Sequence, residues 1–253
     1  MSPIALLTDF GSQDWFVASM KGVILSVNPQ ASIVDINHNV AAGDITAAAF
    51  NLIACHDFFP KGTIFVSVVD PGVGSTRNAI AIFAGEYFFV GPDNGIFSPI
   101  IDNYYKPQIH ALREGRYFLD TVSATFHGRD IFAPVAAHLS NGVGLEKFGP
   151  AHEDIIRLDI PTARAKGKRI SGQIIYIDHF GNAITNIPSS LSLQAKNLHL
   201  KKLSIPLCNC YEDVADKKPC AVRGSCGFVE IAINKGNAAK KLALKTNEAV
   251  SIL

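Results

Sequence analysis

The sequence predicts an α/β domain with an open, mostly parallel sheet, followed by a smaller domain made mainly of β-strands. In the first 150 residues, short apolar segments alternate with segments whose apolar residues recur at helical spacing, the pattern of βαβ units. From residue 170 onward, strand-like segments such as GQIIYID and GFVEIAIN are separated by turn residues. We therefore expect domains at residues 1–150 and 169–253, joined by a surface linker at 151–168.

The elements of the first domain follow in order from apolar spacing and turn signals. The expected strands are 4–8, 32–36, 63–69, 79–84 and 87–90, and the expected helices are 14–27, 44–59 and 129–139. Strands 63–69 and 79–84 are almost continuously apolar, which is typical of a sheet covered on both faces. In the second domain LHLKKLSIPL and EAVSIL complete the strand set, and 237–244 holds one short helix.

Composition limits the class of partner. The chain has 253 residues, of which 48% are hydrophobic, and its net charge is +1. There is no basic excess to follow a phosphate backbone, so we expect a small-molecule ligand and no nucleic acid. No apolar run approaches the roughly 20 residues that span a bilayer, and the start, MSPIALLTDF, lacks the basic region of a signal peptide. We expect no membrane association and a cytoplasmic location.

The cysteines do not form a recognisable metal motif. Four of the five lie close in sequence, at Cys208, Cys210, Cys220 and Cys226. A CxC pair followed by two separate cysteines is not the paired CxxC pattern of a structural zinc site, so reduced packing residues are favoured. The HxxD spacing of His127 and Asp130 has little specificity for a metal. We expect no metal site and no cofactor.

Candidate catalytic residues lie in two segments. In VSVVDPGVGSTR, residues 66–77, an apolar strand leads into Asp70, and a turn rich in glycine and proline lets Arg77 fold back towards it. The alternative is a purely structural ion pair. In TFHGRDIFAP, His127 precedes the small residue Gly128 where a loop enters a helix.

Polar residues also follow several strands, where ligands bind in open α/β sheets. They are Asp9, Asp70, Asp93, Asn94 and Asp178. Each alone could be a turn-forming residue, but the repetition favours a site. The motifs GxGxxG, GxxxxGK[ST], GxSxG and HExxH are all absent, so no common nucleotide or hydrolase fingerprint explains them.

Six segments in order, LLTDFG, VVDPGVG, GPDNG, TFHGRDIFAP, IDHFGNAITNI and EIAINKGNAA, resemble the S-adenosylmethionine (SAM) hydrolases that release adenosine. These enzymes, also called SAM hydroxide adenosyltransferases, are relatives of fluorinase and chlorinase. The resemblance runs nearly end to end. It implies a Rossmann-like amino-terminal domain, a β-barrel carboxyl-terminal domain, and a homotrimer with sites between neighbouring subunits.

The resemblance also assigns residues. The family's catalytic aspartate, arginine and histidine fall on Asp70, Arg77 and His127. The aspartate that binds the ribose hydroxyls falls on Asp9, and the asparagine that contacts adenine falls on Asn182. The remaining substrate positions, chiefly around the methionine portion and the adenine edge, match Asp178, Ser225, Glu230 and Ala238. Phe180 lies beside Asn182 in the FGN segment, and Asp14 is a further substrate-binding candidate.

Departures from the halogenases favour water as the nucleophile. The resemblance places Asp70, Val73 and Gly128 where fluorinase has tyrosine, threonine and a halide-contacting serine. A carboxylate repels a halide but can orient a water molecule. We therefore expect SN2 hydrolysis of SAM at C5′ to adenosine and L-methionine, with His127 either completing the hydrogen-bond network or taking a proton. The alternatives are a SAM-dependent halogenase and a SAM- or adenosine-binding regulator without turnover.

Overall fold

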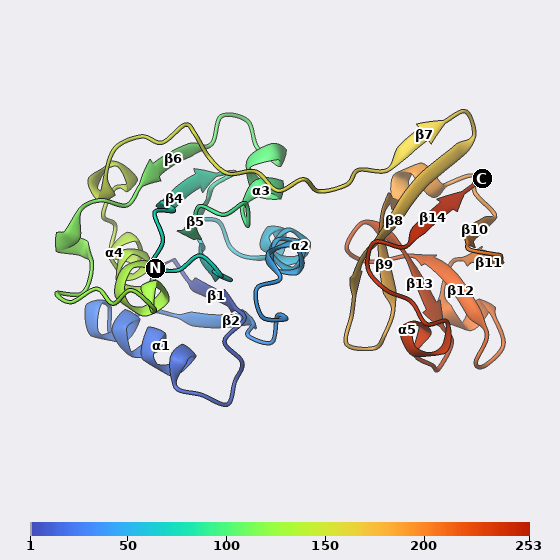
Figure 1. Ribbon diagram of the computed structural model, residues 1–253, viewed down its shortest axis with the longest axis horizontal. Coiled ribbons are helices and arrows are strands. Elements are labelled where there is room, and N and C mark those ends of the chain that lie inside the picture. Colours follow the sequence, from blue (N-terminus) through green and yellow to red (C-terminus); the bar gives the residue numbers. More distant parts are fainter. Residues whose placement is uncertain (1) are drawn as a thin grey trace. The chain divides into compact units, whose positions relative to one another are not determined.

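The computed structural model describes residues 2–253, which form two compact units, one ending at Leu158 and one running from Asp159 to Leu253 (Figure 1). The predicted linker, residues 151–168, is divided between them at this point. Within the described residues, every helix is too short or too polar to cross a membrane.

The first unit is built on a six-stranded mixed sheet with the order β2-β1-β3-β5-β4-β6. Its strands are β1 (Ile4–Thr8), β2 (Ile33–Asn37), β3 (Ile64–Val68), β4 (Ala79–Ala84), β5 (Tyr87–Pro92) and β6 (Gln108–Ala111). Strands β2, β1, β3 and β5 are mutually parallel, whereas β4 is antiparallel to β5 and β6. The prediction of a mostly parallel α/β sheet is confirmed.

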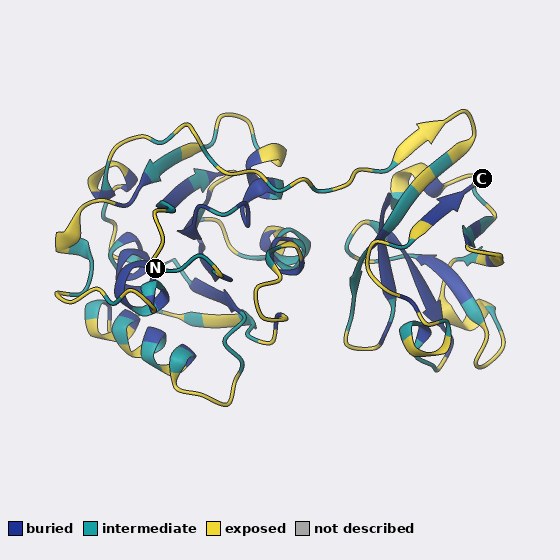
Figure 2. Cartoon of the chain, viewed as in Figure 1, coloured by how far each residue is buried: buried dark blue, intermediate teal, exposed yellow. Residues whose placement is uncertain are grey.

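Helices cover both faces of this sheet. They are α1 (Phe16–Val27), α2 (Ile45–Cys55), α3 (Ser98–Asn103) and α4 (Ala133–Ser140). Helices α1 and α4 pack together on one face over Ile4, Leu6 and Val66, and α2 packs with α3. Every residue of β1 and β3 is buried, as Figure 2 shows, because side chains on both sides of these strands meet a helix layer.

Several boundaries differ from the predictions. The first helix begins at Phe16, two residues late, and the second ends at Cys55 and is followed by a 3₁₀ turn at His56–Phe58. The predicted helix 129–139 is a π-helical turn at Gly128–Phe132 that continues into α4. Apolar spacing marks the buried face of a helix but does not distinguish its hydrogen-bond pattern near the ends.

The second unit is a seven-stranded barrel. Its strands, in the order β14-β10-β11-β12-β13-β9-β8, close on themselves through the pairing of β14 with β8. They are β8 (Arg169–Ile177), β9 (Ala183–Pro188), β10 (Asn197–Leu200), β11 (Leu203–Cys208), β12 (Pro219–Arg223), β13 (Phe228–Ile233) and β14 (Ala249–Ile252). The β-barrel architecture is confirmed.

Two additions complete this unit. Strand β7 (Arg164–Lys166) pairs with β8, and the short helix α5 (Ala238–Lys241) lies within the predicted 237–244 range. The segment LHLKKLSIPL forms two antiparallel strands, β10 and β11, rather than one. Its turn places Lys201 at a positive φ of 52°.

Candidate active site

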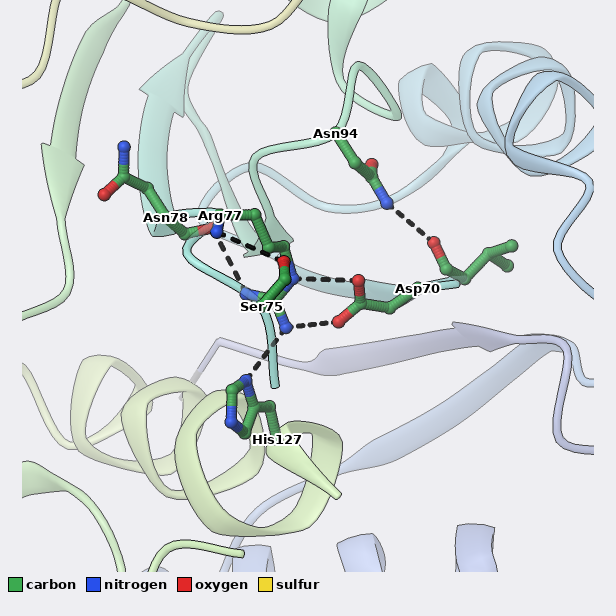
Figure 3. A network of polar contacts seen from close by, with 7 residues as sticks. Asp70, Ser75, Arg77, Asn78, Asn94 and His127 are labelled. Atoms are coloured by element: carbon green, nitrogen blue, oxygen red, sulfur yellow. Dashed lines mark hydrogen bonds and ion pairs between the residues drawn. The ribbon is translucent and has the colours of Figure 1, made fainter. Parts of the chain in front are cut away.

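The candidate site of the first unit lies at the carboxyl edge of the parallel strands. Strands β1, β3 and β5 are neighbours in the sheet, and Asp9, Asp70 and Asn94 follow their respective ends. Asn94 donates from Nδ2 to the carbonyl oxygen of Val69 at 2.8 Å, which ties the loop after β5 to the end of β3 (Figure 3). Three of the predicted strand-end residues therefore share one edge.

The turn after β3 brings Arg77 back towards Asp70. The amide of Val73 donates to the carbonyl of Asp70 at 3.2 Å, so the chain reverses directly after the strand. Gly74 has a positive φ of 77°, and a Cβ atom there would lie 2.3 Å from the carbonyl oxygen of Ala124. The turn thus approaches the loop that carries His127 too closely for any side chain at this position.

Asp70, Arg77 and His127 form one hydrogen-bonded group (Figure 3). Arg77 donates from Nε to Oδ1 of Asp70 at 2.8 Å and from Nη2 to Oδ2 of the same carboxylate. Nη2 also lies 2.9 Å from Nδ1 of His127. The side chains of Arg77 and Asp70 are only 7% and 4% exposed, so this bidentate pair is largely removed from water.

The contact with Arg77 determines which ring nitrogen of His127 carries the proton. A guanidinium has only donors, so Nδ1 of His127 must accept and the neutral ring bears its hydrogen on Nε2. Burial and the positive charge of Arg77 lower the pKa of His127 below its ordinary value, which favours this neutral form. His127 therefore offers an N–H donor from Nε2.

The loop that carries His127 is anchored by Asp130. This buried carboxylate accepts hydrogen bonds from the amide of Ser123 at 2.9 Å, from its hydroxyl at 2.8 Å, and from Nε of Arg129 at 2.6 Å. Next to His127, a Cβ atom at Gly128 would lie 3.3 Å from Sδ of Met20 and 3.4 Å from ring atoms of two phenylalanines. The small residue is therefore matched to tight packing.

Asp9 and Asp14 have different surroundings. Asp9 accepts the amide of Gly43 on Oδ2 at 2.8 Å and is half-buried at the end of β1. Asp14 is exposed in the loop that precedes α1.

In the second unit, Asp178 and Asn182 form a compact turn after β8. Oδ1 of Asp178 accepts the amide of Asn182 at 2.8 Å, and Oδ2 accepts its side-chain Nδ2 at 3.0 Å. Phe180 lies in this turn with 72% of its surface exposed. The turn rests on helix α5, because Gly181 accepts the amide of Ala239 at 2.8 Å, one residue after the buried Ala238.

Glu230 is a buried carboxylate on β13, and Ser225 is exposed in the hairpin turn that precedes this strand. Burial raises the pKa of Glu230, and the nearby charge of Asp178 raises it further. Tyr211 donates its hydroxyl hydrogen to Oε1 of Glu230. Sequence reasoning missed Tyr211 because it lies outside every matched segment and 19 residues from its partner.

Two of the four cysteines of the second unit serve packing, whereas Cys210 is exposed and its thiol donates to Oδ1 of Asp213. Cys220 is buried in a small apolar cluster with Val222 and Ala232, against which Cys208 packs, and both are free thiols. Among residues 2–253, no three histidine, cysteine, aspartate or glutamate side chains are grouped so that they could hold a metal ion.

The fold and site define a two-domain protein with a largely buried carboxylate–guanidinium pair, hydrogen-bonded to a half-buried imidazole, at the edge of an α/β sheet. A β-barrel with its own polar cluster follows. Residues 4–149 match the family model of the SAM hydroxide adenosyltransferase N-terminal domain, and residues 172–251 match that of the C-terminal domain. The chain belongs to the SAM hydroxide adenosyltransferase family.

Individual proteins agree with this membership. The chain is 34% identical to a protein of Thermus thermophilus named (R)-S-adenosyl-L-methionine hydrolase, over 100% of both chains. It is 29% identical to a fluorinase of Actinoplanes sp. over 73% of this chain and 71% of the relative. A crystal structure of an uncharacterized conserved protein from Thermotoga maritima superposes with a TM-score of 0.93 at 33% identity, covering 98% of this chain and 99% of that one.

Proposed function

We propose that this protein hydrolyses SAM at C5′ to adenosine and L-methionine, with Asp70, Arg77 and His127 as its catalytic residues. Hydrolysis of SAM follows from the family and from a full-length relative at 34% identity. The observation that supports the residue roles is the hydrogen-bonded group of these three side chains, in which the Asp70–Arg77 pair is largely buried and His127 is half-buried. From the name of the Thermus relative, we further propose that the substrate is the (R) epimer at sulfur.

The reaction makes modest demands on the protein. The positively charged sulfur of SAM leaves as the neutral thioether of methionine, so no acid is needed for the leaving group. Water attacks C5′ opposite the sulfur as the C5′–S bond breaks, and the water then loses one proton. Alignment of a nucleophile with its target can lower a barrier by about 7–11 kcal/mol. Placing one water correctly is therefore the main task of the site.

The geometry suggests how the three residues divide this task. Nε2–H of neutral His127 donates to the water oxygen and orients it, while Nδ1 is occupied by Arg77. His127 therefore completes the network rather than taking the proton. Each carboxylate oxygen of Asp70 accepts one N–H of Arg77, which holds the carboxylate in place. Each oxygen keeps a further lone pair, which can accept the proton that the water loses. Arg77 also stabilises hydroxide character on the water.

The same carboxylate supports water over a halide. The positive charge of Arg77 is already paired with Asp70, and an ionised carboxylate has no hydrogen to donate to a halide, so a halide entering here gains little attraction. Gly128 also offers no side-chain donor to a halide, and an added Cβ atom there would lie 3.3 Å from Sδ of Met20. A neutral nucleophile that both donates and accepts hydrogen bonds suits this environment better.

Substrate recognition is proposed to draw on both units. Asp9 has Oδ1 available for ribose hydroxyls, since Oδ2 is used by Gly43. Asn182, held in place by Asp178, is proposed to contact adenine, with the exposed ring of Phe180 beside it. The remaining contacts, chiefly around the methionine portion and the adenine edge, are proposed for Asp14, Asp178, Ser225, Glu230 and Ala238.

A complete site is proposed to form between neighbouring subunits of a homotrimer, and the protein is proposed to be cytoplasmic. The five free cysteines suit a reducing compartment. Light scattering tests the assembly, because a fully active monomer would contradict the shared site. Fractionation of the source cells tests the location.

The central test is incubation of purified protein with SAM in chloride buffer, followed by chromatography of the products. Adenosine and methionine in equal amounts are expected, with and without a chelator. A 5′-halo-adenosine product would identify a halogenase. Tight binding of SAM with no product from either route would identify a regulator.

A further inference from the structure

We propose that Tyr211 is a positioning residue for substrate binding: its hydroxyl fixes the Glu230 carboxylate so that the other oxygen of Glu230 faces a cationic group of the substrate. This inference rests on the proposed function, because it takes SAM as the substrate and Glu230 as one of its contacts. SAM offers such a group in the ammonium of its methionine portion.

Glu230 is placed with one carboxylate oxygen bonded within the barrel. It lies on β13, where it is 7% exposed, and its Oε1 accepts the hydrogen bond of Tyr211. A Cβ atom at Gly224 would lie 2.6 Å from Oε2, so the absence of a side chain there leaves space for this second oxygen. One oxygen of Glu230 is therefore used within the barrel and the other is left for a partner.

Tyr211, which holds Glu230, is placed by a hydrogen-bonded turn. Tyr211 begins a short 3₁₀ turn, Tyr211–Asp213. Asp213 closes this turn by accepting the amides of Asn209 at 2.8 Å and Cys210 at 3.3 Å on Oδ2. The turn therefore holds the Tyr211 phenol where it can bond Glu230. Because Glu230 is already held by this bond, it loses less conformational entropy when it binds a ligand.

The titratable neighbours of Glu230 are acidic groups. The titratable groups that interact with it are Asp178 after β8, Tyr211, Cys220 on β12 and Cys226 in the hairpin turn. All four are acids, so within residues 2–253 none of these neighbours supplies a positive charge. A buried carboxylate in such surroundings gains most from a cationic ligand.

The protonation state of Glu230 depends on burial and on the same neighbours. Burial raises the pKa of Glu230, whereas the hydrogen bond from Tyr211 lowers it and Asp178 raises it again. The hydroxyl thus favours the ionised form that attracts a cation. Without it, the pKa of Glu230 rises further, and the carboxylate is neutralised over a wider acidic range.

The test compares the wild-type protein with Tyr211→Phe, Glu230→Gln and the double variant. Tyr105→Phe is the matched control, because Tyr105 is 87% exposed in the first unit. Tyr211→Phe should raise KM for SAM by about tenfold, with kcat nearly unchanged. The rise in KM on acidification should begin at a higher pH than in the wild type. In the Glu230→Gln background, Tyr211→Phe should have little further effect.

An unchanged KM and pH profile in Tyr211→Phe would overturn the inference. It would also be overturned if Tyr211→Phe changed KM by the same factor in the wild-type protein and in the Glu230→Gln background. Ultraviolet titration of the tyrosines tests the contact without SAM: Glu230→Gln should lower the raised pKa of Tyr211, and an unaltered titration would refute the contact. If the wild-type protein binds SAM without turnover, the affinity measured by calorimetry replaces KM. If it binds no SAM, the proposed function fails, and this inference fails with it, whatever the titration shows.

Discussion

Arg77→Lys is the most informative substitution in the catalytic group, because it keeps the positive charge and removes the planar fork of donors. Arg77→Ala would leave Asp70, which is 4% exposed, without its partner. Breaking a buried pair in this way typically destabilises a protein by roughly 3–5 kcal/mol. A lysine ammonium can still pair with the carboxylate, so Arg77→Lys should stay folded while losing the contact that holds His127.

The expected effect on rate follows from that lost contact. The hydrogen bond from Nη2 of Arg77 to Nδ1 of His127 is 2.9 Å long and has a charged donor. Such bonds contribute about 1.5–3 kcal/mol. If this energy holds the ring in its aligned orientation, its loss reduces the aligned population, and therefore kcat, by about 10- to 150-fold. Adenosine binding should change little, because this contact acts on the water rather than on the nucleoside.

Single-turnover kinetics at saturating SAM and calorimetric titration with adenosine measure the two quantities separately. Thermal unfolding of the same samples serves as the control for folding. The reasoning is refuted if Arg77→Lys retains kcat within about threefold of the wild type. It is equally refuted if the affinity for adenosine falls by the same factor as the rate.

Four further outcomes are expected. Burial and Arg77 lower the pKa of His127 below 6.5, so its neutral form should persist as the pH falls through 6.5. The fall of kcat on acidification should therefore occur below pH 6.5. A fall of kcat above pH 6.5 would contradict the assignment of His127 as a neutral donor. The same shift makes the contribution of His127 to folding stability complete above pH 6.5 and lost on acidification, which urea unfolding at several pH values can measure. Gly74→Ala should reduce kcat and stability together, because residue 74 has a φ of 77° and its Cβ would lie 2.3 Å from the carbonyl oxygen of Ala124. If the variant melts and turns over like the wild type, the turn tolerates a side chain and the reasoning is wrong. Mixing Asp9→Ala with Asn182→Ala protein should restore activity through hybrid sites, whereas no recovery in mixed oligomers would argue for a site within one chain.

Much of the fold was accessible from local patterns. The near-continuous apolar character of residues 63–69 predicted a strand buried on both faces, and β3 is such a strand. The sequence did not predict that β4 runs antiparallel to its neighbours β5 and β6. The apolar sequence pattern of a buried strand is the same whether the strand runs parallel or antiparallel to its neighbours. The paired β10 and β11 were missed because apolar residues flank their two-residue turn on both sides.

The candidate site divides in the same way. The sequence by itself determined that Asp70 follows a buried strand, that Arg77 can turn back towards it, and that His127 precedes a glycine at a helix entrance, since each depends on residues near in the chain. Only the tertiary structure decided that Nη2 of Arg77 meets Nδ1 of His127 across 50 residues, which sets the tautomer of the ring. The contact of Tyr211 with Glu230 was likewise decided by strand pairing, because the pairing of β12 with β11 and with β13, and not local sequence, brings these two side chains together.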